Sequence, residues 1–248
     1  MGVAICLIVA TAALYAIKKH ELDGIDSRTY CAKPLKHLTV VLVDQTDALN
    51  KIQMADLKGQ LGKVASNIPP NGMLKIVSVT SDPAALLVAK EAFCNPGDEN
   101  TVNSMTGNKA MQQQDYLRNY TARISKVVDS LATQAPSKTS PIMEAVQAVN
   151  IANFKGRDIA DKNLIVVSDF LQNSAGVSFY QGVPEFETFE RGPFWPSVKS
   201  DFATTHVDLR MVYRSDASQL QTLRLKNFWR VYFTNQNSSD PSIGDING

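Results

Sequence analysis

Two short apolar runs, each ending at a carboxylate, constrain the fold of this chain most strongly. The first is HLTVVLVD at residues 37–44, and the second is NLIVVSD at residues 163–169. Runs this short and this rich in β-branched residues are typical of strands buried on both faces of a sheet. In open α/β sheets, ligands bind beyond the carboxyl ends of such strands. The first run is therefore predicted to form the central strand, and the residues after it are predicted to form a site.

Strand-like and helix-like segments alternate along most of the chain. Further strands are predicted at residues 73–80 and 206–213. Residues 82–93 fit either helical or strand spacing, and their position before a turn favours an edge strand. Helices are predicted at about 50–67, 108–132, from 141 onward, and 217–233, because their apolar residues recur at helical spacing. This alternation predicts a three-layer, doubly wound α/β fold with a mostly parallel sheet. One domain is expected over residues 37–234, preceded by a tether at 21–36 and followed by a frayed polar tail at 235–248.

The N-terminus predicts an attachment to a membrane. Residues 2–17 carry no charge, and Lys18 and Lys19 follow at once. As a helix this stretch reaches roughly 24 Å, whereas the hydrocarbon core measures about 30 Å, so snorkelling lysines or local thinning would cover the difference. We expect one short transmembrane helix within residues 1–20 and a single-pass membrane protein. A cleaved secretory signal and a buried helix are the alternatives.

Two cysteines bear on the side of the membrane that the domain occupies. Cys31 and Cys94 lie outside the apolar stretch and could form a disulfide, the alternative being two buried free thiols. Lysines after the apolar stretch favour a cytoplasmic domain. The low charge content, together with many Asn, Gln, Ser and Thr residues, favours the extracytoplasmic side, which we adopt.

Composition and missing motifs argue against several functions. A formal net charge of +1 without clustered Lys and Arg gives no basis for nucleic-acid binding. The chain has no phosphate loop and no G-x-G-x-x-G, so no nucleotide site is expected. It also lacks the G-x-S-x-G elbow that carries a catalytic serine in α/β hydrolases. The chain contains only three histidines that could act as catalytic bases. We therefore predict no enzymatic activity. A haloacid-dehalogenase-like phosphatase is the enzymatic alternative, because Asp44-x-Thr46 follows an apolar strand.

Oxygen-bearing side chains are concentrated in three loops at the expected sheet edge. The first loop carries Asp44, Gln45, Thr46 and Asp47, the second Thr139 and Ser140, and the third Ser168 and Asp169. Carboxylates and hydroxyls are hard donors, which suit Mg²⁺ or another divalent cation that keeps some of its water.

These three loops resemble the metal-ion-dependent adhesion site of von Willebrand factor A-like (vWA) domains. Asp44 and Thr46 match the first two positions of the Asp-x-Ser-x-Ser loop, whereas Ala48 stands where the second Ser should be. Thr139 matches the Thr of the second loop, and Asp169 stands where the family often has Thr-Asp-Gly. The resemblance implies a Mg²⁺ site at Asp44, Thr46, Thr139 and Asp169, with one ligand missing.

The function that this resemblance implies is binding of another protein in a membrane-associated complex, with the metal bridging to an acidic side chain of the partner. Further partner contacts are predicted at Asp47 and Ser140 and at three aromatic residues, Phe189, Phe194 and Trp195, because aromatic side chains are common in interface hot spots. The alternative for these rings is that they cover one edge of the sheet. The alternative for the whole protein is a structural scaffold with a vestigial metal site.

Overall fold

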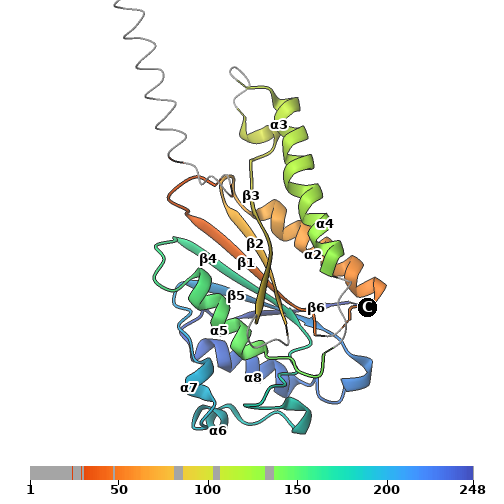
Figure 1. The fold of residues 1–248 in the computed structure, drawn as a ribbon, viewed down its shortest axis with the longest axis vertical. Helices are drawn as coiled ribbons and strands as arrows, with labels where there is room; N and C mark the ends of the chain where they lie inside the picture. Colours follow the sequence, from red (N-terminus) through yellow and green to blue (C-terminus); the bar gives the residue numbers. More distant parts are fainter. Residues whose placement is uncertain are drawn as a thin grey trace, which may run out of the picture.

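The described residues form one six-stranded sheet with β1 (His37–Asp44) in an interior position. The structure is a computed structural model that describes residues 24, 29, 31–46, 48–80, 86–102, 107–131 and 137–247. The strand order is β3-β2-β1-β4-β5-β6 (Figure 1). The other strands are β2 (Met73–Val79), β3 (Leu87–Cys94), β4 (Asp161–Ser168), β5 (Thr205–Val212) and β6 (Ser242–Ile246). All neighbouring pairs are parallel except β2 and β3, so the predicted mostly parallel sheet is confirmed, and its edge strand β3 is antiparallel.

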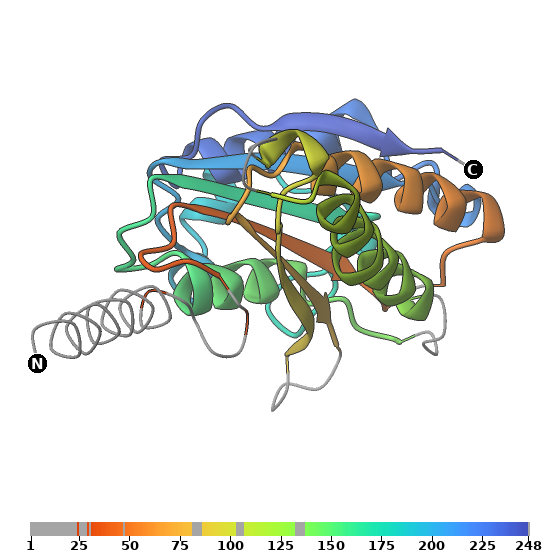
Figure 2. The same cartoon turned by 90° about the horizontal axis from the view of Figure 1, so that it is seen from above.

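Helices cover both faces of this sheet and give the predicted three layers (Figures 1 and 2). Side chains alternate along β1, so Val40 and Leu42 enter one core while Val41 and Val43 enter the other. The first core packs against α5 (Ile142–Asn153) and α8 (Leu223–Thr234), with the short helices α6 (Phe186–Glu190) and α7 (Trp195–Val198) beside them. The second core packs against α2 (Lys51–Asn67) and against the helix that ends in α4 (Ala122–Ser130).

The helix α2 begins at a capping box. Asn50 is the N-cap, and its side chain accepts hydrogen bonds from the backbone N–H groups of Ile52 and Gln53. The Gln53 side chain accepts in return from the Asn50 backbone N–H. Leu57 and Leu61 are buried on the predicted apolar face. The second helix on this side runs through α3 (Lys109–Asp115), a π-helical turn (η2, Tyr116–Thr121) and α4, and it buries Tyr120, Ile124 and Val128.

The segment after β4 that is rich in aromatic residues, residues 176–200, forms part of the first core, and we call it the aromatic segment. Phe189 and Trp195 are 7% and 5% exposed, and both lie against other rings, Phe189 with its centroid 5.4 Å from that of Phe228 on α8. Phe194 is half-buried beside Phe189. The prediction that these three residues form a partner-binding surface is therefore wrong for Phe189 and Trp195. Their apolar area stabilises the fold by packing on α8, as in the alternative that the rings cover the sheet.

The C-terminal segment corrects a predicted boundary. The expected frayed tail contains β6, which pairs in parallel with β5, and the side chain of Ile246 is buried in the second core. The backbone N–H of Asn247 donates to Asp56 Oδ2 on α2. The domain therefore extends beyond residue 234. In addition, α8 starts at Leu223 rather than near residue 217, because residues 215–217 form a separate 3₁₀ turn.

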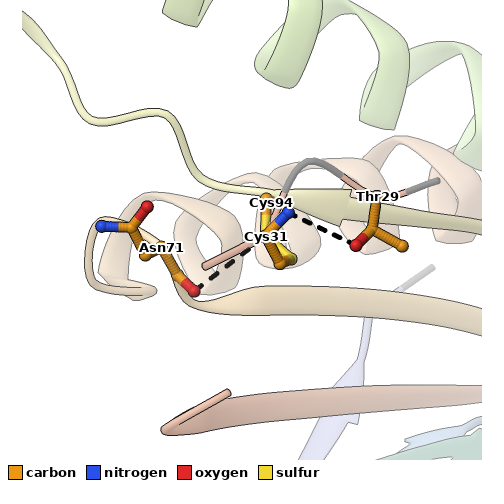
Figure 3. The surroundings of a disulfide bond; sticks show 4 residues. All are labelled: Thr29, Cys31, Asn71 and Cys94. Carbon is orange, nitrogen blue, oxygen red and sulfur yellow. Dashed lines mark hydrogen bonds between the residues drawn. A yellow bond between two sulfur atoms is a disulfide. The ribbon is translucent and has the colours of Figure 1, made fainter. Parts of the chain in front are cut away.

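A disulfide joins Cys31 to Cys94, which decides between the two alternatives that the sequence left open. The two Cα atoms are 5.3 Å apart, within the range that this bond requires. Figure 3 shows that the bond lies between Thr29, whose Oγ1 accepts from the Cys31 N–H at 3.4 Å, and Asn71, whose carbonyl lies 3.9 Å from Cys94 Sγ. The chain before β1 is thus fixed to the end of edge strand β3, and the folded unit begins before the predicted residue 37.

The predicted membrane anchor at residues 2–17 lies outside the described residues. Within the described ranges, none of the helices combines the length and the apolar character that a membrane crossing requires.

Candidate functional site

The candidate site lies at the carboxyl ends of β1 and β4, where the chain direction switches between the two faces of the sheet. After β1 the chain enters α2 on one face, and after β4 it enters the aromatic segment on the opposite face (Figure 2). Adjacent parallel strands whose connections leave in opposite directions open a crevice between them, and ligands bind there in α/β proteins. We use the term rim for the carboxyl ends of these strands and the loops beside them. These loops are the ones that follow β1, β4 and β5 and the one that precedes α5.

Asp44 is the centre of the rim. Its Oδ1 accepts hydrogen bonds from the Thr46 backbone N–H at 2.9 Å and from Thr46 Oγ1 at 2.6 Å. Its Oδ2 accepts from Ser140 Oγ at 2.8 Å and from Ser168 Oγ at 2.9 Å. Three loops far apart in the sequence therefore place one hydroxyl each on a single carboxylate. Hydrogen bonds to an ionised acceptor are stronger than neutral ones, so this cluster holds the three loops together.

The Ser140 hydroxyl reaches Asp44 because of a two-residue bridge to the loop after β4. The Ser140 N–H donates to the Asn173 carbonyl at 2.8 Å, and the Asn173 N–H donates to the Ser140 carbonyl at 2.9 Å. This bridge turns residue 140 towards the rim interior, and Thr139 is exposed. In this loop the hydroxyl that bonds to Asp44 therefore belongs to Ser140, while the predicted ligand Thr139 lies exposed one position earlier.

Asp169 and Asp47 complete the set of predicted acidic residues. Asp169 is 5% exposed, and its Oδ1 accepts from the Leu171 N–H at 2.9 Å. Phe170, which stands where the vWA triplet has Gly, adopts φ 61°, a backbone region that Phe rarely occupies. Its carbonyl accepts from the Trp229 indole N–H at 3.0 Å, which helps to hold this conformation. Asp47 lies outside the described residues.

Glutamine side chains that the sequence analysis did not select connect the rim loops. Gln172 is fully buried, accepts from the Met143 N–H at the start of α5, and donates to Glu144. Gln221 donates to the carbonyls of Asp169 and Val212, and so links the loops after β4 and β5. No sequence pattern distinguishes these glutamines from exposed ones, because each is positioned by a partner far away in the chain.

A narrow cavity lies within the rim, and we tested whether its residues fit a hard divalent cation. It is lined by Asp44, Leu49, Ser168, Asp169, Val212 and Arg214, and its volume of about 10 Å³ admits a single water-sized occupant. Mg²⁺ requires six oxygen donors and usually keeps several waters. Ala48 supplies no side-chain oxygen, and Arg214 adds a permanent positive charge to the same cavity. Within the described part of the chain, no three His, Cys, Asp or Glu side chains gather as a metal-binding group. The residues as they stand do not fit a divalent ion.

The rim residues also do not match the site of a haloacid-dehalogenase-like phosphatase. Its nucleophile would be Asp44, whose two oxygens accept four hydrogen bonds, and its second Asp would stand at Thr46. Both described histidines lie at the opposite edge: His37 starts β1, where its Nδ1 is 2.7 Å from Asp161 Oδ2, and His206 lies near the start of β5. The described rim residues therefore do not reproduce the Asp-x-Asp pair that this phosphatase family needs, because Thr46 stands at its second position.

Comparisons with known proteins concern the fold. No protein-family model matches this sequence, and no curated protein matches it. A similar solved structure, von Willebrand factor type A from Catenulispora acidiphila, has 10% identity and a TM-score of 0.45, over 88% of this chain and 40% of that chain. The ArnB paralog VWA2 from Sulfolobus acidocaldarius has 13% identity and a TM-score of 0.43, over 87% and 42%. The pilus adhesin SpaC from Lactobacillus rhamnosus GG, in an open conformation, has 11% identity and a TM-score of 0.46, over 90% and 29%. This chain thus spans less than half of the length of each of the three.

Proposed function

We propose that this chain is a vWA-like protein-binding module that recognises a partner protein through the rim. The observation that carries the proposal is the Asp44 cluster, in which a carboxylate at the switch point receives hydroxyls from three loops. This bonding makes the loops rigid before a partner arrives, and a rigid surface loses less conformational entropy on binding. Because the donor set does not fit a divalent ion, the proposed recognition does not pass through one.

We further propose that the module is tethered to a membrane by residues 2–17 and lies on the extracytoplasmic side. The uncharged stretch followed by Lys18 and Lys19 supports the tether. The disulfide between Cys31 and Cys94 supports an oxidising compartment, since structural disulfides are rare in the cytosol. A protein in a membrane-associated complex is therefore the proposed partner.

The test compares proteins that co-purify with the detergent-solubilised full-length chain and with two matched variants. Thr139→Arg places a bulky charge on the exposed part of the rim. Asn67→Arg places the same group at the end of α2, an exposed position at the opposite edge of the sheet. We expect a specific protein to be retained by the wild type and by Asn67→Arg and to be lost with Thr139→Arg.

Other results of this comparison contradict the proposal. A partner that is retained equally by both variants would indicate a structural scaffold that assembles through other surfaces. A partner lost only with Asn67→Arg would place the recognition surface at the opposite edge.

A further inference from the structure

Arg214 brings a cation to the rim at the position where the vWA pattern loses a ligand. It follows β5 by two residues, and its side chain lines the same cavity as Asp44 and Asp169. Its Nη1 donates to the carbonyl of Ala48 at 3.4 Å. Ala48 stands in place of the second Ser of the loop. The guanidinium of Arg214 therefore contacts the same residue that lacks the ligand hydroxyl.

The backbone of Arg214 is fixed relative to the two acidic loops. Its N–H donates to Gln221 Oε1 at 2.7 Å, and Gln221 Nε2 donates to the Asp169 carbonyl at 3.1 Å. The Arg214 side chain is only 21% exposed. Asp216 lies 3.8 Å from Arg214 Nε but is 79% exposed, and solvent-exposed pairs contribute little. The guanidinium is therefore held at the cavity rather than drawn away from it.

A tethered guanidinium and a bound metal ion differ in how they supply charge. Arg stays protonated throughout the accessible pH range, and its positive charge is present at every metal concentration. Two carboxylates that line one narrow cavity repel each other, and a cation between the loops that carry them lowers this repulsion. A divalent ion entering the same cavity would meet the positive charge already there.

We propose that the Arg214 guanidinium is the built-in cation of this rim and substitutes for the divalent ion of a vWA site, so that the order of the rim does not depend on metal. The inference concerns the rim of the proposed function and deepens that proposal. Its test requires no partner, so the built-in cation and the recognition function can fail separately.

The test is thermal unfolding of the full-length chain in detergent, with Mg²⁺ or with a chelator. The wild type should unfold at the same temperature in both. Two variants are compared with it. Arg214→Gln removes the cation from the cavity. The double variant Ala48→Ser with Arg214→Gln removes the cation and also restores a hydroxyl ligand. We expect Mg²⁺ at ten times its dissociation constant to raise the Tm of the double variant by about 4 °C, and that of Arg214→Gln by less.

Two controls make the result specific to Arg214. Arg224→Gln removes an equally charged side chain that pairs with exposed Glu185 away from the rim, and it should stay insensitive to Mg²⁺. Arg214→Lys keeps the charge and should also stay insensitive. A Mg²⁺-dependent rise in the Tm of the wild type would overturn the proposal, and so would the lack of any rise in both Arg214→Gln and the double variant.

Discussion

Removing the disulfide tests how much the segment before β1 contributes to the fold. Cys31 and Cys94 are separated by 63 residues in sequence, and their bond closes a loop that contains β1, α2, β2 and β3. In the chain-entropy treatment, a loop of this length removes about 14 cal/mol/K of entropy from the unfolded chain, or about 4 kcal/mol at 25 °C. We therefore expect the double variant Cys31→Ala with Cys94→Ala to lose about 4 kcal/mol of unfolding free energy.

The assay is urea unfolding of the full-length chain, followed by circular dichroism under non-reducing conditions. The Tm of the double variant should fall by about 10 °C, since each kcal/mol corresponds to about 2–4 °C in a domain of this size. The dependence of free energy on urea should become steeper, because an unfolded chain without the crosslink exposes more surface. Dithiothreitol should destabilise the wild type by a similar amount and leave the double variant unchanged. A loss below about 1 kcal/mol would refute the entropic reasoning and would mean that the unfolded chain keeps residues 31 and 94 restrained even without the bond.

Further substitutions at three positions address single contacts. Asn71 has φ 63°, so Asn71→Ala should cost about 1 kcal/mol in urea unfolding, whereas Asn71→Gly should cost nothing. Gln172→Ala leaves the buried N–H of Met143 without its acceptor and should cost about 2 kcal/mol, a result contradicted by an unchanged midpoint. Burial, and to a smaller extent Tyr116, raises the pKa of Tyr120 above its ordinary value. The unfolded phenol ionises near pH 10 while the folded one stays neutral, so stability should fall as the pH rises through this range, and Tyr120→Phe should make the fall shallower.

The strands at the centre of the sheet were predictable because burial on both faces leaves a continuous apolar run. In β1, six consecutive residues are buried, and in β4 the last five are buried. The edge strand β6 was not predictable in the same way. It has one covered edge and contains Gly244 and Asp245, so its pairing to β5, rather than its own hydrophobicity, defines it as a strand.

The rim was predictable only where its residues are neighbours in sequence. Asp44 and Thr46 are two residues apart, and the Thr46 hydroxyl and N–H both bond to the Asp44 carboxylate. The choice between Thr139 and Ser140 depends on a backbone bridge to Asn173, which no local pattern specifies. A shift of one residue in an extended segment exchanges the inward and outward side chains, and the sequence alone leaves that choice open.

Arg214 shows why counting ligands is an incomplete test of a degenerate ion site. A comparison with the vWA motif shows only that Ala48 lacks the ligand oxygen of the second Ser. By that comparison alone, the site is a metal site with one ligand fewer. The sheet register pairs Ser168 with Met211, and the chain that continues beyond β5 then brings a cation from position 214 to the acidic loops. The electrostatic requirement of two carboxylates can be met by a guanidinium as well as by a metal ion, so the missing oxygen at Ala48 and the charge of Arg214 have to be considered together. The charge that arrives from a neighbouring strand therefore has to be counted before such a site is described as vestigial.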